Sequence, residues 1–274
     1  MTFSWLKGHG TENDFVLLPD PDGRLHGDLD PAFVAALCDR RRGIGADGVL
    51  RVVRTSVLDL PSAGEWFMDY RNADGSVSEM CGNGVRVFAR HLLDEGLVPA
   101  DEPVVVGTRD GDKIVHPADG GTLSVDMGTY ELRGTSKVEA AGRTWEAQDV
   151  RTGNPHAVAF VERLTDAGTL VDAPTHDAAT YPEGVNVEFV QRLGERHVAM
   201  RVHERGSGET RSCGTGACAV GIATALADGA AERPVTYRVD VPGGRLDVTL
   251  TPDDHVVLTG PAEIVARGEM EWLA

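Results

Sequence analysis

The sequence lacks several features that mark particular classes of protein. No Lys/Arg cluster offsets its formal charge of −17 at pH 7, so nucleic acid and anionic membranes, which bind basic surfaces, are not expected partners. No apolar run reaches the length of a membrane span, and residues 1–9 lack the apolar core of a signal peptide. We therefore expect a cytoplasmic protein that holds any anionic substrate with local dipoles and a few cations.

Cysteine is also scarce, with four residues in a chain of 274. Cys38, Cys81, Cys213 and Cys218 are too sparse for a disulfide scaffold and have no CxxC spacing. We expect reduced thiols, with Cys38 and Cys218 in apolar packing roles. The chain is long enough for one large domain or two ordinary ones.

One short pattern, Cys-Gly-x-Gly, occurs twice, at Cys81 and at Cys213. A helix-forming stretch follows each copy, so each thiol is predicted at a helix N-terminus, where the helix dipole lowers a thiol pKa. Two such thiols suit acid–base catalysis, one on each face of a substrate carbon. The neighbouring backbone amides are then expected to hold a substrate carboxylate. These amides belong to Gly82 and Asn83 in one copy and to Gly214 and Thr215 in the other.

Other interpretations of the two cysteines remain open. They could form a structural disulfide or be buried and inert, although inert thiols would leave the flanking glycines unexplained. The repeat could also be a coincidence in a chain with 33 glycines.

The rest of the chain is dominated by short β-branched runs bounded by Gly, Asp and Pro, many with the period of two that is typical of strands. Residues 245–250 and 255–260 read as a hairpin, and 32–42 as one of few helices. Many strands with few helices predict an α+β protein. The duplicated motif predicts two similar domains facing each other, each presenting one cysteine. We expect these domains at residues 1–127, with 264–274 returning as a strand, and at 128–263.

An ordered set of motifs closely resembles the diaminopimelate epimerase family over almost the whole chain. The resemblance implies cofactor-independent interconversion of LL- and meso-2,6-diaminopimelate, in the route to lysine and peptidoglycan precursors. It also implies pseudo-symmetric domains of mixed sheet wrapped around a central helix, an active site in the cleft between them and no metal. The motifs lie at residues 9–15, 42–48, 72–86, 153–156, 186–190 and 204–216.

The resemblance also assigns roles to single residues. It implies that Cys213 accepts and Cys81 donates the proton in the LL-to-meso direction, while His156 and Glu204 tune the thiols. The side chains that resemble substrate contacts offer donors and acceptors to ammonium and carboxylate groups, and an arginine can fork onto a carboxylate. They are Asn13, Asn72, Asn154, Asn186, Glu204 and Arg205.

Several positions depart from the family pattern. Thr11 and Glu12 replace the usual Leu-Gly, and the extra carboxylate alters the local charge. Gly48 stands where many members have a glutamine that touches substrate, and His203 replaces a usual Trp. The resemblance also implies a homodimer; family dimers have used a C-terminal tyrosine at about the position of Ala266, and this chain lacks that tyrosine.

Other functions are compatible with parts of this pattern. Proline racemases and hydroxyproline epimerases share the two thiols but bind a small ring, whereas the asparagines and the arginine here favour a long, doubly zwitterionic substrate. A phenazine-biosynthesis type of isomerase would lack the thiols. A redox-sensing dithiol protein or an amino-acid-binding module would not exchange a substrate α-hydrogen with solvent.

Overall fold

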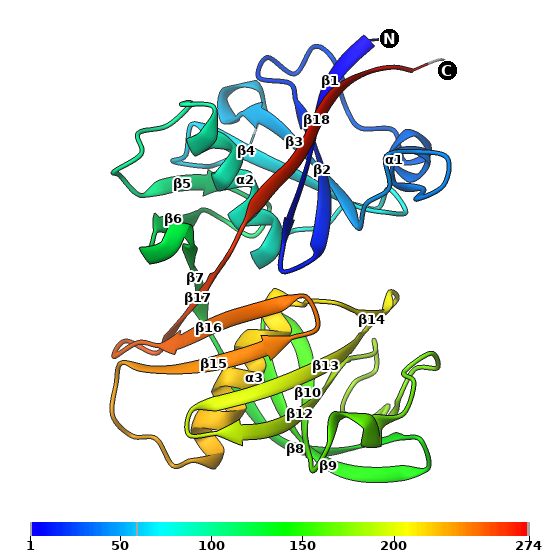
Figure 1. Ribbon diagram of the computed structural model, residues 1–274, viewed down its shortest axis with the longest axis vertical. Coiled ribbons are helices and arrows are strands. Elements are labelled where there is room, and N and C mark those ends of the chain that lie inside the picture. The colour runs from blue at the N-terminus through cyan, green and yellow to red at the C-terminus, as the bar shows by residue number, and fades with distance from the viewer. Residues whose placement is uncertain (1, 59, 273–274) are drawn as a thin grey trace. The chain divides into compact units, whose positions relative to one another are not determined.

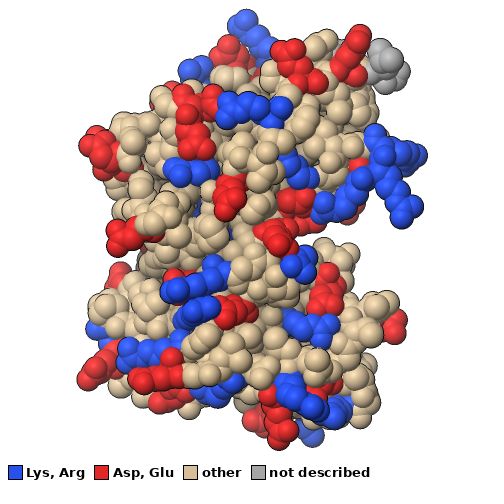
Figure 2. Space-filling model, viewed as in Figure 1, with Lys and Arg blue, Asp and Glu red and all other residues tan. Residues whose placement is uncertain are grey.

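The computed structural model describes residues 2–58 and 60–272 and divides into two compact units. The first unit contains the described residues of Met1–Val125 and Pro261–Ala274, and the second contains Asp126–Gly260. Among the described residues, no helix is both long and apolar enough to cross a membrane. Figure 2 shows acidic side chains interspersed with basic ones over the face in view.

The first unit is a mixed β-sheet with its longest helix packed against it (Figure 1). Its strands are hydrogen-bonded in the order β18-β1-β2-β3-β4-β5-β6-β7, in which the pairs β2–β3 and β4–β5 are parallel and the others antiparallel. The elements are β1 (Thr2–Gly10), β2 (Asn13–Pro19), α1 (Pro31–Cys38), β3 (Gly48–Arg54), η1 (Thr55–Val57), β4 (Trp66–Asn72), α2 (Gly82–Asp94), β5 (Val104–Gly107), β6 (Lys113–Pro117), η2 (Asp119–Gly121), β7 (Leu123–Thr129) and β18 (Glu263–Glu271).

The second unit repeats this arrangement. Its strands follow the order β8-β9-β10-β12-β13-β15-β16-β17, in which β10–β12 and β13–β15 are parallel and the others antiparallel. The elements are β8 (Glu131–Ala140), β9 (Arg143–Thr152), β10 (Asn154–Val161), η3 (Leu164–Ala167), β11 (Thr175–His176), β12 (Asn186–Gly194), β13 (His197–Glu204), β14 (Gly208–Thr210), α3 (Gly214–Ala227), β15 (Val235–Val241), β16 (Gly244–Leu250) and β17 (His255–Gly260).

The two strand orders match position by position, including the places of the two parallel pairs. In each unit the central helix connects the fifth strand of the order to the sixth: α2 lies between β4 and β5, and α3 between β13 and β15. The predicted fold class is confirmed: α+β, with mixed sheets, few helices and a helix against each sheet. The predicted hairpin of residues 245–250 and 255–260 is also confirmed as β16 and β17.

The central helix of the second unit is buried because its sequence offers little polar surface. In α3, every residue from Gly214 to Ala225 is buried, as expected for a helix that is apolar all round. The helix approaches the sheet closely at Gly221, where a Cβ would lie 2.6 Å from Cγ1 of Val248 on β16.

The first helix is shorter than the sequence predicted. It begins at Pro31, with the Asp30 carboxylate accepting a hydrogen bond from the Ala32 amide, but it ends at Cys38 and not at residue 42. The reason is Asp39, whose carboxylate accepts hydrogen bonds from the amides of Arg41 and Arg42 at 2.8 and 2.9 Å. Such an Asx turn competes with helical hydrogen bonding and turns the chain.

The end of the chain returns to its beginning. Strand β18 runs antiparallel to β1, with Glu271 opposite Thr2, and the two strands lie side by side in Figure 1. Leu273 and Ala274, which the sequence also assigned to this return, lie outside the described residues.

Candidate active site

Each of the two motif cysteines is the N-cap residue of a central helix. Cys81 has an extended backbone, and its Sγ accepts a hydrogen bond from the Gly84 amide at 3.5 Å, at the start of α2. Cys213 does the same at the start of α3, where its Sγ is 3.4 Å from the Gly216 amide. The placement predicted from Cys-Gly-x-Gly is therefore confirmed for both thiols.

Amide side chains surround Cys81 in the first unit. The Asn13 side-chain oxygen accepts hydrogen bonds from Cys81 Sγ at 3.6 Å and from Asn83 Nδ2 at 3.1 Å. Asn83 is fully buried, and its own oxygen accepts a bond from the buried Arg86 guanidinium at 2.8 Å. Asn13 also donates to Asp47 at 2.9 Å. The half-buried sulfur thus belongs to a fixed polar network.

The other side of the α2 N-terminus is apolar. A Cβ on Gly84 would lie 3.4 Å from Cδ2 of Leu50 and 3.5 Å from Cζ of Phe15. Both side chains are fully buried. These are ordinary van der Waals distances, so the start of α2 rests on a hydrocarbon surface.

Cys213 lies in a different environment in the second unit. Its side chain is buried, and Sγ is 3.6 Å from the Thr215 hydroxyl. Beside it, His156 Nδ1 and Glu188 Oε1 are 2.7 Å apart, and both side chains are fully buried. A Cβ on Gly216 would lie 2.8 Å from Glu188 Oε1 and 3.3 Å from Cys213 Sγ. A buried ionisable pair therefore packs against the start of α3.

This environment raises the pKa of the Cys213 thiol well above its ordinary value. Burial is the largest cause, and the carboxylates of Glu204 and Glu188 add to it, while the Thr215 hydroxyl and Gly216 amide oppose it. The lowered pKa predicted from the helix N-terminus is therefore wrong for Cys213. One or two hydrogen bonds at a helix end do not offset full desolvation next to negative charge.

Most of the other predicted residues gather at the strand ends next to these helices. Asn186 Oδ1 accepts a hydrogen bond from the Arg205 backbone amide at 2.9 Å, and the Arg205 guanidinium donates to the Glu183 carbonyl at 2.9 Å. Glu204, the last residue of β13, accepts a hydrogen bond from the Thr210 hydroxyl.

Two of the predicted asparagines make fewer contacts. In the first unit, Asn72 ends β4 and donates to the Ser76 hydroxyl at 3.0 Å. In the second unit, Asn154 is exposed at the start of β10. The structure thus places both within their motifs, next to the strand ends.

The strand registers show that the site residues occupy equivalent positions in the two units. Phe15 pairs with Gly48 across the parallel strands β2 and β3, as His156 pairs with Asn186 across β10 and β12. Gly48 in turn lies opposite Asn72. The equivalent pairs are Asn13 and Asn154, Phe15 and His156, Gly48 and Asn186, Leu50 and Glu188, Asn72 and Glu204, Cys81 and Cys213, and Gly84 and Gly216.

Sequence reasoning did not single out Glu188. It stands between Val187 and Phe189 on β12, and all three side chains are buried. A carboxylate within the apolar run of residues 187–190 was the available signal, because buried charges are rarely kept without a partner.

The structure shows the local conformation at two departures from the family pattern. A Cβ on Gly48 would lie 2.6 Å from the Arg71 carbonyl oxygen and 2.7 Å from Tyr70 Cε2, so a larger side chain cannot occupy this position unless its neighbours move. Thr11 and Glu12 form the turn between β1 and β2 with φ of 50° and 63°. The Leu-Gly usual here places the more permissive residue at the second of these positions.

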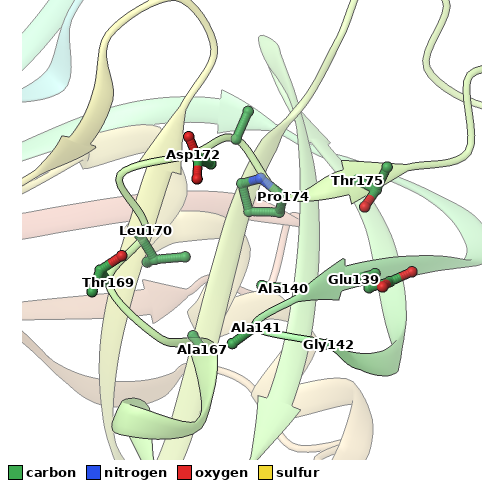
Figure 3. A pocket seen from close by; sticks show the side chains of 11 residues that line it. Glu139, Ala140, Ala141, Gly142, Ala167, Thr169, Leu170, Asp172, Pro174 and Thr175 are labelled. Carbon is green, nitrogen blue, oxygen red and sulfur yellow. The ribbon is translucent and has the colours of Figure 1, made fainter.

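A pocket elsewhere in the second unit does not belong to this site. It has a volume of about 250 Å³ and is lined by residues 139–142, at the end of β8 and the turn that follows, and by the segment from Ala167 to Thr175 (Figure 3). None of the predicted catalytic or binding residues lines it.

Comparisons with known proteins agree with the motif assignment. The family model described as diaminopimelate epimerase matches residues 5–133 and 149–265. The chain is 57% identical to a diaminopimelate epimerase of Streptomyces coelicolor, covering 98% of this chain and 96% of the relative. It is 50% identical to the protein of that name from Thermobifida fusca, with 98% of each chain covered.

Solved structures with lower identity share the fold. A hydroxyproline epimerase from Agrobacterium vitis superposes with a TM-score of 0.67 at 16% identity, covering 98% of this chain and 92% of that one. A phenazine biosynthesis protein of the PhzF family from Bacillus anthracis gives 0.71 at 14% identity, covering 99% and 100%. The match to the family model and the identity to curated relatives show that the chain belongs to the diaminopimelate epimerase family.

Proposed function

We propose that the protein is a cofactor-independent epimerase that interconverts LL- and meso-2,6-diaminopimelate with Cys81 and Cys213 as its two acid–base groups. The observation that carries this proposal is the duplicated N-cap cysteine: each thiol sits at the start of an equivalent helix, 3.5 or 3.4 Å from a glycine amide. The reaction would supply the meso isomer for lysine and peptidoglycan precursor synthesis.

The proposed chemistry needs a base on one face of the α-carbon and an acid on the other. In the LL-to-meso direction, Cys213 as thiolate takes the α-proton, and Cys81 as thiol delivers a proton to the opposite face. The reverse direction exchanges these roles, so each thiol alternates between acid and base.

The amides after each cysteine would stabilise charge as the α-proton leaves. The N-terminal amides of a helix are free of intrahelical partners and attract an α-carboxylate. Removing one such preorganised donor typically costs about 3 kcal/mol of transition-state stabilisation. Gly82 and Asn83 supply these amides on α2, and Gly214 and Thr215 supply them on α3.

The raised pKa of Cys213 makes it a thiol before substrate binds. A substrate ammonium group beside the sulfur opposes the effect of Glu204 and Glu188 and favours the thiolate. Binding and activation are thereby linked, since the base is formed where a cationic substrate is present. His156 is placed to adjust this balance, because its ring bonds to one of the two carboxylates.

Side chains at the strand ends would hold the rest of the substrate. Amide groups can accept from ammonium and donate to carboxylate, and a guanidinium can bind a carboxylate with two bonds. This mixture fits a substrate with an amino acid group at each end. The proposed contacts are Asn13, Asn72, Asn154, Asn186 and Arg205. A homodimer and a cytoplasmic location stay predictions from the sequence.

The test is solvent hydrogen exchange at the substrate α-carbon. Incubation of meso-diaminopimelate with reduced protein in D₂O should place deuterium at the α-carbon and produce the LL isomer, detected by NMR and mass spectrometry. Proline, hydroxyproline and lysine in parallel incubations should remain unlabelled. Correctly folded protein that labels none of the four compounds would sink the proposal, and labelling of proline alone would assign a racemase.

A further inference from the structure

In the chemistry described so far, the carboxylate of Glu188 transfers no proton and makes no proposed contact with substrate. It lies on β12 with a fully buried side chain, and its Oε1 is 2.7 Å from His156 Nδ1. Its second oxygen and His156 Nε2 are buried without a hydrogen-bond partner among the described residues. Burying a carboxylate costs several kcal/mol of desolvation. The interaction with an imidazole offsets this cost only in part when two of the four polar side-chain atoms of the pair make no hydrogen bond. Such a costly pair suggests a role other than stability.

The first unit shows that the fold does not need this pair. The equivalent positions hold Phe15 and Leu50, both fully buried, at the start of α2. The same strand order and the same N-cap geometry form there with hydrocarbon side chains at these two positions. The ionisable pair is therefore specific to the thiol at Cys213.

The local packing brings the carboxylate to that thiol. Gly216 separates the two groups, and a Cβ on it would lie 2.8 Å from Glu188 Oε1 and 3.3 Å from Cys213 Sγ. The glycine leaves room for the carboxylate at the first turn of α3.

We infer that Glu188 is a positioning residue of the epimerisation, which fixes the His156 ring through Nδ1 and controls the protonation of Cys213 from behind the α3 N-terminus. This inference rests on the proposed function, since it assigns Glu188 a role in that same reaction. With Nδ1 held, Nε2 is the ring atom left to exchange a hydrogen bond when substrate arrives. The charge on Glu188 keeps Cys213 protonated until a cation is bound.

Other ionisable groups face this pair and enter the same balance. Glu204 on β13 acts on both Glu188 and Cys213 and raises the pKa of each. Tyr181, in the segment before β12, faces Glu188, and Asp149 and Arg151 on β9 face Tyr181. These groups are unchanged in the variants proposed below.

The first experiment needs no substrate. The rate of iodoacetamide labelling at Cys213 and at Cys81 is measured from pH 7 to 11 by mass spectrometry of their peptides. In Glu188→Gln the midpoint for Cys213 should fall by about one pH unit, because a neighbouring negative charge is gone, while the midpoint for Cys81 stays unchanged. An unmoved Cys213 midpoint, or equal shifts at both cysteines, would overturn the inference.

The second experiment follows epimerisation against pH. Glu188→Gln should lower kcat about tenfold and shift its pH profile, with KM within about twofold, because the acid–base balance and not substrate contact has changed. Glu188→Asp should recover part of kcat. A Glu188→Gln variant with the wild-type profile would contradict the inference, whereas wild-type protein without α-hydrogen exchange would contradict the proposed function. The labelling result is independent of the latter.

A double variant tests the same inference if the Glu188→Gln variant fails to fold. His156→Phe with Glu188→Leu copies the pair that the first unit already accommodates, so it should fold. Its Cys213 midpoint should also fall, since the carboxylate has been removed. A folded double variant with an unchanged midpoint would equally refute the role of Glu188.

Discussion

Two equivalent helix starts carry the two thiols in contrasting surroundings. Behind Cys81 the strands place Phe15 and Leu50, and behind Cys213 the same positions hold His156 and Glu188. The repeated strand order gives both sulfurs the same N-cap geometry. The surroundings of the two sulfurs differ in the two side chains that neighbouring strands place there, and in the second unit Glu188 is one of the groups that raise the pKa of Cys213. A duplicated scaffold can thus supply two chemically different groups.

The largest expected effect comes from removing either thiol. Cys81→Ser and Cys213→Ser should each lose about 10²–10⁴-fold in epimerisation, the usual contribution of a positioned proton-transfer group. The two variants should differ in which isomer they still label. Cys213→Ser keeps the Cys81 thiol and should retain more α-deuteration of the meso isomer. Cys81→Ser keeps the Cys213 thiol and should retain more α-deuteration of the LL isomer. The measurement is deuterium incorporation from each pure isomer.

Normal circular dichroism and unfolding midpoints are the control for these two serine variants. If both variants exchanged the α-hydrogen of both isomers at the same residual rate, the two thiols would not have different roles. Full epimerisation in either variant would remove that cysteine from the mechanism.

A moderate effect is expected at the two equivalent glycines. Gly216→Ala should destabilise the protein by roughly 1–3 kcal/mol, because the new Cβ would lie 2.8 Å from the carboxylate of Glu188 in a packed interior. Gly84→Ala meets neighbours at 3.4–3.5 Å and should be neutral, or stabilising by up to about 1 kcal/mol, through helix propensity. Urea denaturation of the two variants measures the difference, and equal costs would contradict the proposed asymmetry.

The smallest effect is the pH dependence of stability contributed by Glu188, whose equivalent in the first unit is the uncharged Leu50. Burial raises the pKa of Glu188. A carboxyl whose folded pKa lies above its unfolded value favours the folded state at low pH, and this contribution is lost as pH rises through the folded pKa.

Wild type should therefore lose stability relative to Glu188→Gln as the pH rises above the ordinary value of 4.5. The variant Leu50→Met in the first unit is the matched control and should show no such trend. Urea unfolding at several pH values measures both, and a constant difference between wild type and Glu188→Gln would contradict the assignment.

The sequence was sufficient for features that depend on neighbours along the chain. The N-cap cysteines, the helices after them and the hairpin of β16 and β17 all follow from local pattern. The end of α1 was predicted too late because a single carboxylate, Asp39, captures the next amides.

The sequence was not sufficient where the cause lies on a distant strand. The pKa of Cys213 depends on burial and on carboxylates 9 and 25 residues before it in the chain, Glu204 and Glu188. The crowding at Gly48 likewise comes from the Arg71 carbonyl and the Tyr70 ring on β4, which follows a loop. Such effects require the strand register, which local pattern does not contain.

The pairing of β18 with β1 has a consequence for how the protein is made. The second unit is continuous in sequence, so all of its strands have been synthesised before the chain is complete. The first unit has an open edge along β1 until β18 has been synthesised. The first sheet is therefore completed only after every strand of the second unit has been made, so the second unit can fold while the first still lacks an edge strand.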